Sequence, residues 1–160
     1  MGKIYYKPIG IIHTPIKVPN GAPIQPSAGT KIKGSVEIFP EYIKGLKDLL
    51  GFSHIILIYH FHQNKTYSLL VKPFLDNQLR GVFSTRAPSR PNSIGLSIVR
   101  LQRIKDNILY IQDLDIIDGT PLLDIKPFID YFDNRKTNQI GWIKDRISNF
   151  SKTKSDKRFC

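Results

Sequence analysis

Short runs of apolar residues, each bounded by glycine, proline, asparagine or aspartate, recur along most of the chain. Runs of this length with these boundaries are typical of β-strands. They predict strands over residues 5–12, 34–39, 53–61, 68–73, 81–85, 95–104 and 108–116. Because the tight-turn sequence Lys105 to Asn107 joins the last two runs, residues 95–116 are expected to form a hairpin.

Apolar residues follow helical spacing in two places, and both stripes are typical of packing against a core. The first lies between Pro40 and Gly51 and comprises Tyr42, Ile43, Leu46, Leu49 and Leu50. The second, near the C-terminus, comprises Ile140, Ile143, Ile147 and Phe150. Because strands do not alternate regularly with helices, the pattern predicts an all-β, mainly antiparallel fold: a single closed or nearly closed β-barrel with one or two short helices.

One long segment, residues 13–34, has four prolines and no apolar period. A loop of this length inside a compact domain is usually functional or disordered. We expect residues 1–134 to form the barrel domain and residues 135–160 to form a C-terminal helix and a basic tail, without a second domain.

The charge balance favours a polyanionic partner, because 24 Lys and Arg residues face 13 Asp and Glu residues and give a net charge of +11. Nucleic acid is the leading candidate, although a solvated basic tail would explain part of the surplus. That tail carries Lys152, Lys154, Lys157 and Arg158. No apolar run approaches the roughly 20 residues of a membrane helix and no signal peptide is evident, so we expect a cytoplasmic protein with no membrane contact.

The stretch TRAPSRPNSIGLS, residues 85–97, places two arginines close to two prolines. Pro88 and Pro91 restrict their own φ angles and push the residues before them towards extended geometry. The side chains of Arg86 and Arg90 therefore extend from a backbone with little conformational freedom. A guanidinium held in position in this way suits a carboxylate or a phosphate. The alternative is a surface turn with its arginines in solvent.

Two further segments carry candidate chemistry. In residues 113–128, Asp115, Asp118 and Thr120 cluster after a strand, where they either accept ribose hydroxyls or close an Asp-Gly turn. His60 and His62 are two residues apart and would share a face of a strand. A metal site built on them needs another ligand, and hydrogen-bonded cleft histidines are the alternative. The only cysteine, Cys160, excludes an intrachain disulfide and a cysteine metal site.

Together these stretches resemble a known family. FSTRAPSRPNSIGLSIVRL is similar to the FATRSPxRPNPIGLS motif of the tRNA adenine-37 N6-methyltransferase family, also called YaeB-like or TsaA-like. Residues 10–15 and the blocks EIFPEY, GFSHIILIYHFHQN and DGTPLLDIKPF follow in the family's order. The resemblance covers roughly residues 9–132. It implies a β-barrel that uses S-adenosylmethionine without a doubly wound sheet, commonly as a homodimer, with no metal.

The resemblance also implies site residues. The cofactor contacts correspond to Pro23, Ile24, Gln25, His62, Gln63, Arg86, Leu96, Ile117, Asp118, Gly119 and Thr120. Within this set we expect Arg86 to bind the methionine carboxylate or an adjacent anion and Asp118 to bind a ribose or amine. Leu96, with Ile94 beside it, is expected to form an apolar surface. The chain departs from the family pattern at Ile24, where arginine is frequent, and at Ser93, where proline is usual.

The implied reaction is methyl transfer to N6 of threonylcarbamoyl-adenosine at position 37 of tRNA, in the anticodon loop. Arg90 and Asn92 are candidates for tRNA contact or for fixing their loop, and Lys31 and Lys33 for phosphate contact. Three alternatives remain open: a non-catalytic barrel that binds tRNA or S-adenosylmethionine, an enzyme acting on another nucleophile, and a metal hydrolase built on His54, His60, His62 and an aspartate.

Overall fold

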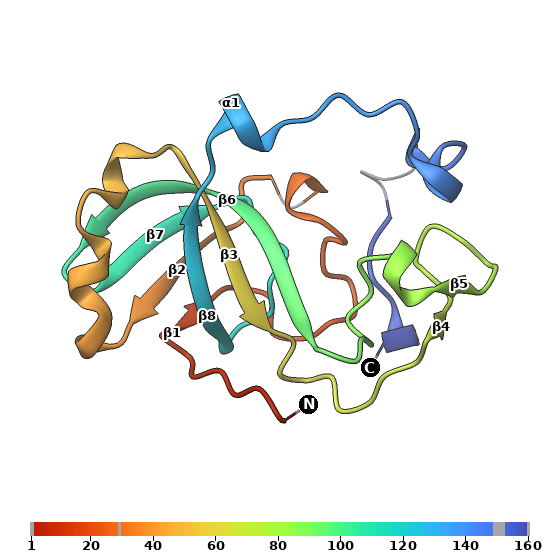
Figure 1. Cartoon of the computed structure of the whole chain (residues 1–160), viewed down its shortest axis with the longest axis horizontal. Helices are drawn as coiled ribbons and strands as arrows, with labels where there is room; N and C mark the ends of the chain where they lie inside the picture. Colours follow the sequence, from red (N-terminus) through yellow and green to blue (C-terminus); the bar gives the residue numbers. More distant parts are fainter. Residues whose placement is uncertain (1, 29, 149–152, 160) are drawn as a thin grey trace.

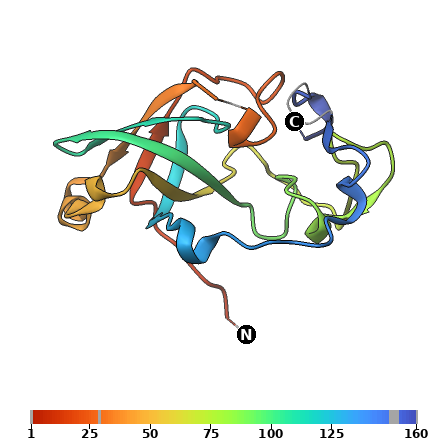
Figure 2. The same cartoon turned by 90° about the horizontal axis from the view of Figure 1, so that it is seen from above.

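The structure is a computed structural model that describes residues 2–28, 30–148 and 153–159. A closed barrel forms one half of the molecule, and a second region of loops and short elements lies beside it (Figures 1 and 2). We call this second region the lobe; it consists of residues 64–92 together with residues 140–148 and 153–159. The predicted all-β barrel is confirmed.

Six antiparallel strands form the barrel in the order β1-β2-β7-β6-β3-β8. They are β1 (Gly10–His13), β2 (Lys33–Ile38), β3 (His54–His60), β6 (Ile94–Lys105), β7 (Ile108–Gln112) and β8 (Thr120–Pro127). Pairing of β1 with β8, where Gly10 lies opposite Leu122, closes the barrel and leaves none of its strands as an edge. Because neighbours are antiparallel, β1, β3 and β7 end where β2, β6 and β8 begin.

The strands form a barrel because their side chains alternate between the buried interior and the outer surface. In β6, Gly95, Ser97, Val99 and Leu101 are buried, while the residues between them are exposed. The same alternation in β3 buries Ile55, Leu57 and Tyr59. Apolar side chains from all six strands thus fill the interior, and their removal from water is the main stabilising contribution.

The predicted hairpin forms between β6 and β7, with Lys105 paired to Ile108 and Asp106 at φ 55° in the turn. Aspartate is one of the few residues that adopt this left-handed conformation readily. The second strand ends at Gln112 rather than at residue 116. Residues 113–116 leave the sheet but keep alternating, so that Leu114 and Ile116 are buried and Asp115 lies between them.

Three further strand predictions need correction, and one strand was missed. Residues 5–9 precede β1; residues 5–8 are exposed, and Pro8 lacks the N–H that a ladder needs. Of residues 68–73 only β4 (Leu70–Val71) is a strand, and residues 81–85 give β5 (Arg80–Gly81) followed by the 3₁₀ helix Val82–Ser84. The eighth strand, β8, was not among the predicted runs, because two prolines and two charged residues interrupt its apolar pattern.

The helical predictions are confirmed only in part. The stripe between Pro40 and Gly51 forms two 3₁₀ helices, Pro40–Leu46 and Leu49–Gly51, separated at Asp48, which has φ 65°. At the C-terminus the described residues hold α1 (Asp130–Asp133) and the 3₁₀ helices Gly141–Ile143 and Lys157–Phe159 instead of one long helix. Phe150, Lys152 and Cys160 lie outside the described residues. No helix in the described part of the chain is long and apolar enough to span a membrane.

Candidate functional site

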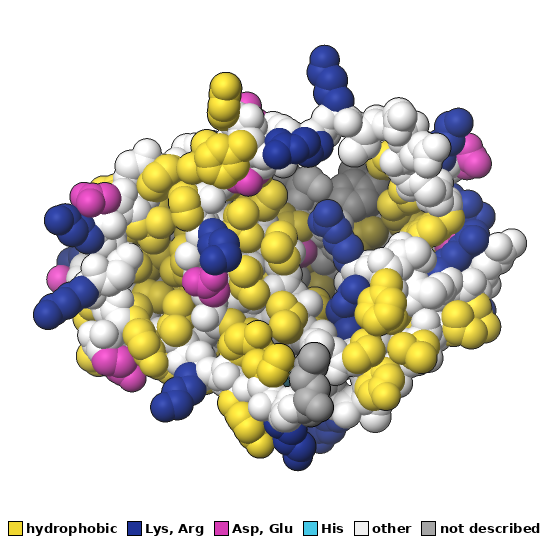
Figure 3. All heavy atoms as spheres, in the orientation of Figure 1, with side chains coloured by type: hydrophobic (Ala, Val, Ile, Leu, Met, Phe, Trp, Pro, Cys, Tyr) yellow, Lys and Arg dark blue, Asp and Glu magenta, His cyan; other side chains and the backbone are white. Residues whose placement is uncertain are grey.

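A cavity of about 390 Å³ lies at the end of the barrel where β1, β3 and β7 finish. We call it the barrel-end cavity. Figure 3 shows a hollow between the barrel and the lobe on the face drawn in Figure 1. A volume of this order suits a drug-sized molecule, and small-molecule sites are commonly built at such mouths of β-barrels.

The barrel side of the cavity depends on a contact between a tyrosine and a glycine. Tyr59, at the end of β3, is 4% exposed and lies across Gly95 at the start of β6. A Cβ at position 95 would lie 2.2 Å from the Tyr59 ring and 2.9 Å from the Phe61 ring. Only glycine therefore lets the two rings, which meet edge to face with centroids 5.5 Å apart, cover the end of the core.

A chain of three polar side chains follows this contact into the cavity. The Tyr59 hydroxyl lies 3.0 Å from Ser97 Oγ, and the Ser97 hydroxyl donates to Asp115 Oδ1 over 2.7 Å. Because Ser97 has a single proton, the Tyr59 hydroxyl is the donor in the first bond. Tyr59 and Asp115 both line the cavity, so the chain ends at a carboxylate on its surface.

Burial decides the protonation of this chain. It raises the pKa of Asp115 to about 6, although the Ser97 hydrogen bond, the residue's own backbone N–H and the charge of Arg86 act in the opposite direction. Burial, and then the charge of Asp115, raises the pKa of the Tyr59 hydroxyl above its ordinary value. At neutral pH Asp115 is therefore mostly ionised and Tyr59 remains a neutral donor.

The opposite side of the cavity is made of loops. Arg86 Nη1 donates to Gln25 Oε1 over 2.6 Å, which joins the proline-rich loop of residues 14–32 to the loop of residues 85–92. Arg90 also lines the cavity, but its Nη1 is directed at backbone carbonyls of its own loop, with Thr85 O at 2.8 Å and Val82 O and Ala87 O at 3.3 Å each. These bonds favour a role for Arg90 in fixing the loop.

Asp118 holds the start of the proline-rich loop. Its Oδ1 accepts the Thr14 N–H over 2.9 Å and its Oδ2 accepts Lys17 Nζ over 2.7 Å. The Lys17 hydrogen bond and the Thr14 N–H lower the pKa of this carboxyl. Asp118 is thus an ionised anchor between the β7–β8 connection and the loop after β1.

His62 bridges the end of β3 to the start of β8. Its Nδ1 lies 3.3 Å from Thr120 Oγ1, whose proton goes to Ile117 O over 2.7 Å. The histidine is therefore the donor, and the neutral tautomer with its proton on Nδ1 fits this contact. Burial, and then the charge of His60, lowers the pKa of His62.

The C-terminal residues close the loop side of the cavity. Gly21 N donates to Ser155 O over 2.8 Å and Ser155 N donates to Ala22 O over 3.0 Å. Arg158 Nη1 donates to Pro73 O over 2.6 Å, and the Phe159 ring packs edge to face on Phe74. Ser155, Asp156 and Phe159 consequently line the cavity, although the sequence suggested only a basic tail.

A second cavity, of about 650 Å³, adjoins the first within the lobe. It is mainly apolar and includes the rings of Phe74, Phe83, Trp142 and Phe159. The two cavities share Ile24, Gln25, Phe74, Thr85, Arg86 and Phe159. The Arg86–Gln25 hydrogen bond therefore stands between them.

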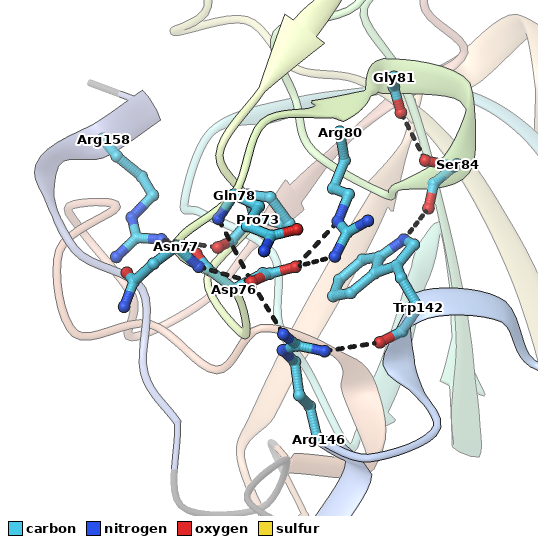
Figure 4. A network of polar contacts seen from close by, with 10 residues as sticks. All are labelled: Pro73, Asp76, Asn77, Gln78, Arg80, Gly81, Ser84, Trp142, Arg146 and Arg158. Atoms are coloured by element: carbon cyan, nitrogen blue, oxygen red, sulfur yellow. Dashed lines mark hydrogen bonds and ion pairs between the residues drawn. The ribbon is translucent and has the colours of Figure 1, made fainter.

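The lobe is held together around one buried carboxylate, Asp76, whose side chain is 3% exposed (Figure 4). Its Oδ2 accepts Arg80 Nε over 2.8 Å and Arg80 Nη2 over 2.7 Å, and Arg146 Nη2 lies 3.2 Å from Oδ1. Burial opposes ionisation, but Arg80 and nearby backbone N–H groups bring the pKa of Asp76 below its ordinary value. Trp142 Nε1 donates to Ser84 O over 2.8 Å, which fixes the C-terminal segment beside β5.

Comparison with known proteins identifies the family. The sequence profile of the tRNA-methyltransferase O N-terminal domain matches residues 11–134, which include all of the barrel except Gly10, as well as β4 and β5. The chain belongs to this family. A crystal structure of TrmO from Pseudomonas aeruginosa superimposes with a TM-score of 0.74 at 33% identity, over 88% of this chain and 63% of that chain.

Two curated relatives of the family differ in length. The probable S-adenosyl-L-methionine-binding protein of Pyrococcus abyssi is 56% identical over 156 residues, which cover 98% of this chain and 85% of the relative. The human tRNA (adenine(37)-N6)-methyltransferase is 37% identical over 142 residues, which cover 83% of this chain and 32% of the relative. The chain thus spans about a third of the human enzyme and less than two thirds of the Pseudomonas chain.

The structure brings most of the family's expected cofactor residues together. Those that line the barrel-end cavity are Pro23, Ile24, Gln25, His62, Gln63, Arg86, Leu96, Ile117 and Thr120. Asp118 and Gly119 are not among its lining residues; they belong to the turn that anchors the loop. Of the nucleic-acid candidates only Arg90 lines the cavity. Lys31 and Lys33 lie at the cavity end of the barrel, beside Gln112 and Asp113, and Asn92 is exposed.

Sequence reasoning did not single out several residues of the site. Tyr59, Phe74 and the C-terminal Ser155 and Phe159 line the cavity, and Ser97 supports it from the core. Asn64 joins two loops, with its Nδ2 donating to Pro88 O over 3.1 Å. Alternation in β6 was the one signal for Ser97, since it places a serine among apolar core residues. The metal alternative lacks support, because no three His, Cys, Asp or Glu side chains among the described residues gather into a metal site.

Proposed function

We propose that this chain binds S-adenosylmethionine in the barrel-end cavity and transfers its methyl group to N6 of adenosine 37 in tRNA. The observation that carries the proposal is the gathering of nine cofactor residues, from four separate segments of the chain, around one cavity of suitable volume. Membership of the family and the names of the relatives in Pyrococcus abyssi and human support it.

The lining suits a nucleoside joined to an amino acid. Arg86 offers a guanidinium for the methionine carboxylate, a pairing that accommodates two oxygens at once. Leu96, Ile117 and Pro23 supply apolar surface for the adenine and the carbon chain. Asp118 fixes the loop that carries Pro23 to Gln25, and its contact with a ribose or amine stays a prediction.

The contribution of the protein to the reaction is mainly orientation. When bound, S-adenosylmethionine supplies a methyl group on a cationic sulfur. The loops tied by Arg90 and Asp118 hold the cavity in shape, and the C-terminal residues exclude water from one side. Alignment of two reactants in a shaped site is worth on the order of 7 kcal/mol or more of the barrier in well-oriented reactions.

The finer parts of the proposal concern the substrate and the assembly. We propose threonylcarbamoyl-adenosine in the anticodon loop as the acceptor, since an unpaired base can be extruded into a pocket. A homodimer is proposed because Ile98, on the outer face of β6 and outside both cavities, is 38% exposed. Hydrophobic side chains gather over this part of the barrel in Figure 3. Because tRNA is the proposed substrate, we assign the reaction to the cytoplasm.

A second candidate function is binding without transfer. The Pyrococcus relative, which this chain covers almost completely, is named for binding S-adenosylmethionine alone, whereas the human methyltransferase is about three times longer than the matched region. In this case the barrel would bind the cofactor or tRNA as a module.

One assay separates the two functions. The purified chain is incubated with S-adenosylmethionine carrying a labelled methyl group, together with tRNA that is either fully threonylcarbamoylated or lacks that modification. The proposal expects label at N6 of adenosine 37 in the first tRNA only. Equal labelling of both tRNAs would contradict the substrate assignment, and cofactor binding without labelling would favour the binding module.

A further inference from the structure

Asp115 stands out among the residues of the barrel-end cavity because it is a carboxylate without a cationic partner of its own. In the described part of the chain no lysine or arginine forms an ion pair with it. Its hydrogen bonds come from Ser97 Oγ and from its own backbone N–H. A negative charge withdrawn from water in this way is costly unless a positive charge comes to it.

None of the described charged groups around Asp115 supplies this positive charge. Arg86, across the cavity, lowers the cost of the charge but is engaged with Gln25. Arg90 is directed at carbonyls of its own loop, and Asp156 is paired with Arg158 at 2.7 Å. On the barrel side the facing groups are Tyr59 and Ser97, both neutral donors, and His62 beyond them is neutral at pH 7. The cavity thus offers a positive group, the Arg86 guanidinium, and at a separate place a negative group, the Asp115 carboxylate.

We propose that Asp115 is the counter-charge for a cationic group of bound S-adenosylmethionine, so that Asp115 and Arg86 together recognise the opposite charges of the ligand. The proposal rests on the proposed function of the cavity. Two groups of the ligand share the required chemistry, the α-ammonium of its methionine part and the sulfonium. Ser97 and Tyr59 are positioning residues in this arrangement, because their hydrogen bonds keep one oxygen of Asp115 fixed and leave the carboxylate ionised.

The test is calorimetric titration of the wild-type chain and of Asp115→Asn with three ligands: S-adenosylmethionine, S-adenosylhomocysteine and 5′-methylthioadenosine. Asparagine keeps the acceptor for Ser97 and removes the charge. The substitution is expected to weaken S-adenosylmethionine by about tenfold to a hundredfold, in keeping with the loss of a charge-assisted contact. The matched control is Asp113→Asn, which alters an aspartate two residues away that is outside both cavities and is expected to leave all three affinities unchanged.

The ligand series distinguishes the two cationic groups. If Asp115 faces the ammonium, the substitution weakens S-adenosylmethionine and S-adenosylhomocysteine equally and leaves 5′-methylthioadenosine, which has neither charge, unaffected. If Asp115 faces the sulfonium, S-adenosylmethionine is weakened far more than S-adenosylhomocysteine. Unchanged affinity of Asp115→Asn for S-adenosylmethionine overturns the inference alone. Failure of the wild-type chain to bind S-adenosylmethionine overturns the proposed function with it.

A pH series on the wild-type chain gives an independent readout. Only the ionised carboxylate attracts a cation, so affinity for S-adenosylmethionine is expected to fall about tenfold between pH 7.5 and pH 5. The other titratable groups of the cavity, His62 included, are the same in both proteins, so the difference between wild type and Asp115→Asn isolates Asp115. Ser97→Ala removes the hydrogen bond that favours the ionised form and is expected to move the midpoint to higher pH. Identical pH profiles for wild type and Asp115→Asn would overturn the inference.

Discussion

The two sides of the barrel-end cavity are built by different means. The barrel side is made of residues in or next to strands, whose backbones are fixed by ladder hydrogen bonds and whose side chains pack with the core. The loop side is made of turns and 3₁₀ helices that depend on individual side chains, above all Asp76, Arg90 and Asp118. Packing defects should therefore damage the first side, and loss of single polar partners should damage the second.

The largest expected effect is that of Asp76→Ala. It leaves Arg80 and Arg146 without their shared carboxylate in a partly buried place, which costs about 3 to 4 kcal/mol for comparable buried pairs. Hydrogen exchange is expected to quicken in residues 70–82 and 140–147 and to stay slow in β3 and β6. Asp124→Ala, which removes an exposed pair with Lys126, is the control and should change stability by less than about 0.5 kcal/mol. Equal acceleration throughout the barrel would refute the separation of the two sides.

Gly95→Ala tests the barrel side. The added methyl group would lie 2.2 Å from a ring that cannot move without disturbing the core, and overpacking of this kind costs about 2 to 3 kcal/mol. Urea denaturation measures the loss. The matched control on the loop side is Gly81→Ala, where nothing lies within 4 Å of the new Cβ and φ is −58°. Similar losses for both glycines would show that the close approach to Tyr59 is unimportant.

Arg86→Ala separates ligand binding from stability on the loop side. Because Arg86 is exposed and its one hydrogen bond within the described part of the chain is to Gln25, the free energy of unfolding should change little. Affinity for S-adenosylmethionine should fall by about 2 kcal/mol, the usual range for a hydrogen bond to a charged group. Calorimetry and thermal unfolding on the same preparations measure the two quantities. Binding equal to that of wild type would remove Arg86 from the ligand site.

Asp115→Asn should change stability with the opposite sign. The folded-state pKa of about 6 exceeds the ordinary value of 3.8, so ionisation of Asp115 destabilises the free protein above pH 6 and the penalty disappears as pH falls towards 4. The variant should accordingly be more stable than wild type by up to about 3 kcal/mol at pH 7.5, with a difference near zero at pH 4. Aspartates with lowered pKa values, such as Asp76, affect both proteins alike. A variant less stable than wild type at pH 7.5 would exclude this interpretation.

The contrast between the two sides also explains which features the sequence made predictable. Alternation in residues 94–101 and the turn at Asp106 are local signals, and both gave correct elements. The strand β8 was not predicted because Pro121 and Pro127 are unfavourable for a strand when only the local sequence is considered. Pairing with both β1 and β3, which are distant in the sequence, stabilises it in the fold. The place of the C-terminal residues in the cavity was not predicted for the same reason, since contacts with residues 19–23 and 73–74 fix their positions.

Within the site, similarity to the family located the segments but not the role of each carboxylate. Asp115 and Asp118 are three residues apart in a segment that leaves the sheet, so periodicity does not say which one faces the cavity. The structure distinguishes their roles. Leu114 and Ile116 are buried on either side of Asp115, whereas the carboxylate of Asp118 accepts hydrogen bonds from Lys17 Nζ and the Thr14 N–H. The partners that decide the matter come from the start of the chain, beyond the reach of local pattern.

Closure of the barrel between its first and last strands has a consequence for biosynthesis. Gly10 and Leu122 pair although more than one hundred residues separate them. The seam, by which we mean the pairing of β1 with β8, therefore cannot form until the ribosome has released β8. Until then β1 exposes an unpaired edge, and contacts of such long sequence separation fold slowly, on the order of milliseconds to seconds. Nascent chains should consequently depend on chaperones during this interval, and substitutions that weaken the seam should reduce the yield of folded protein more than the stability of molecules already closed.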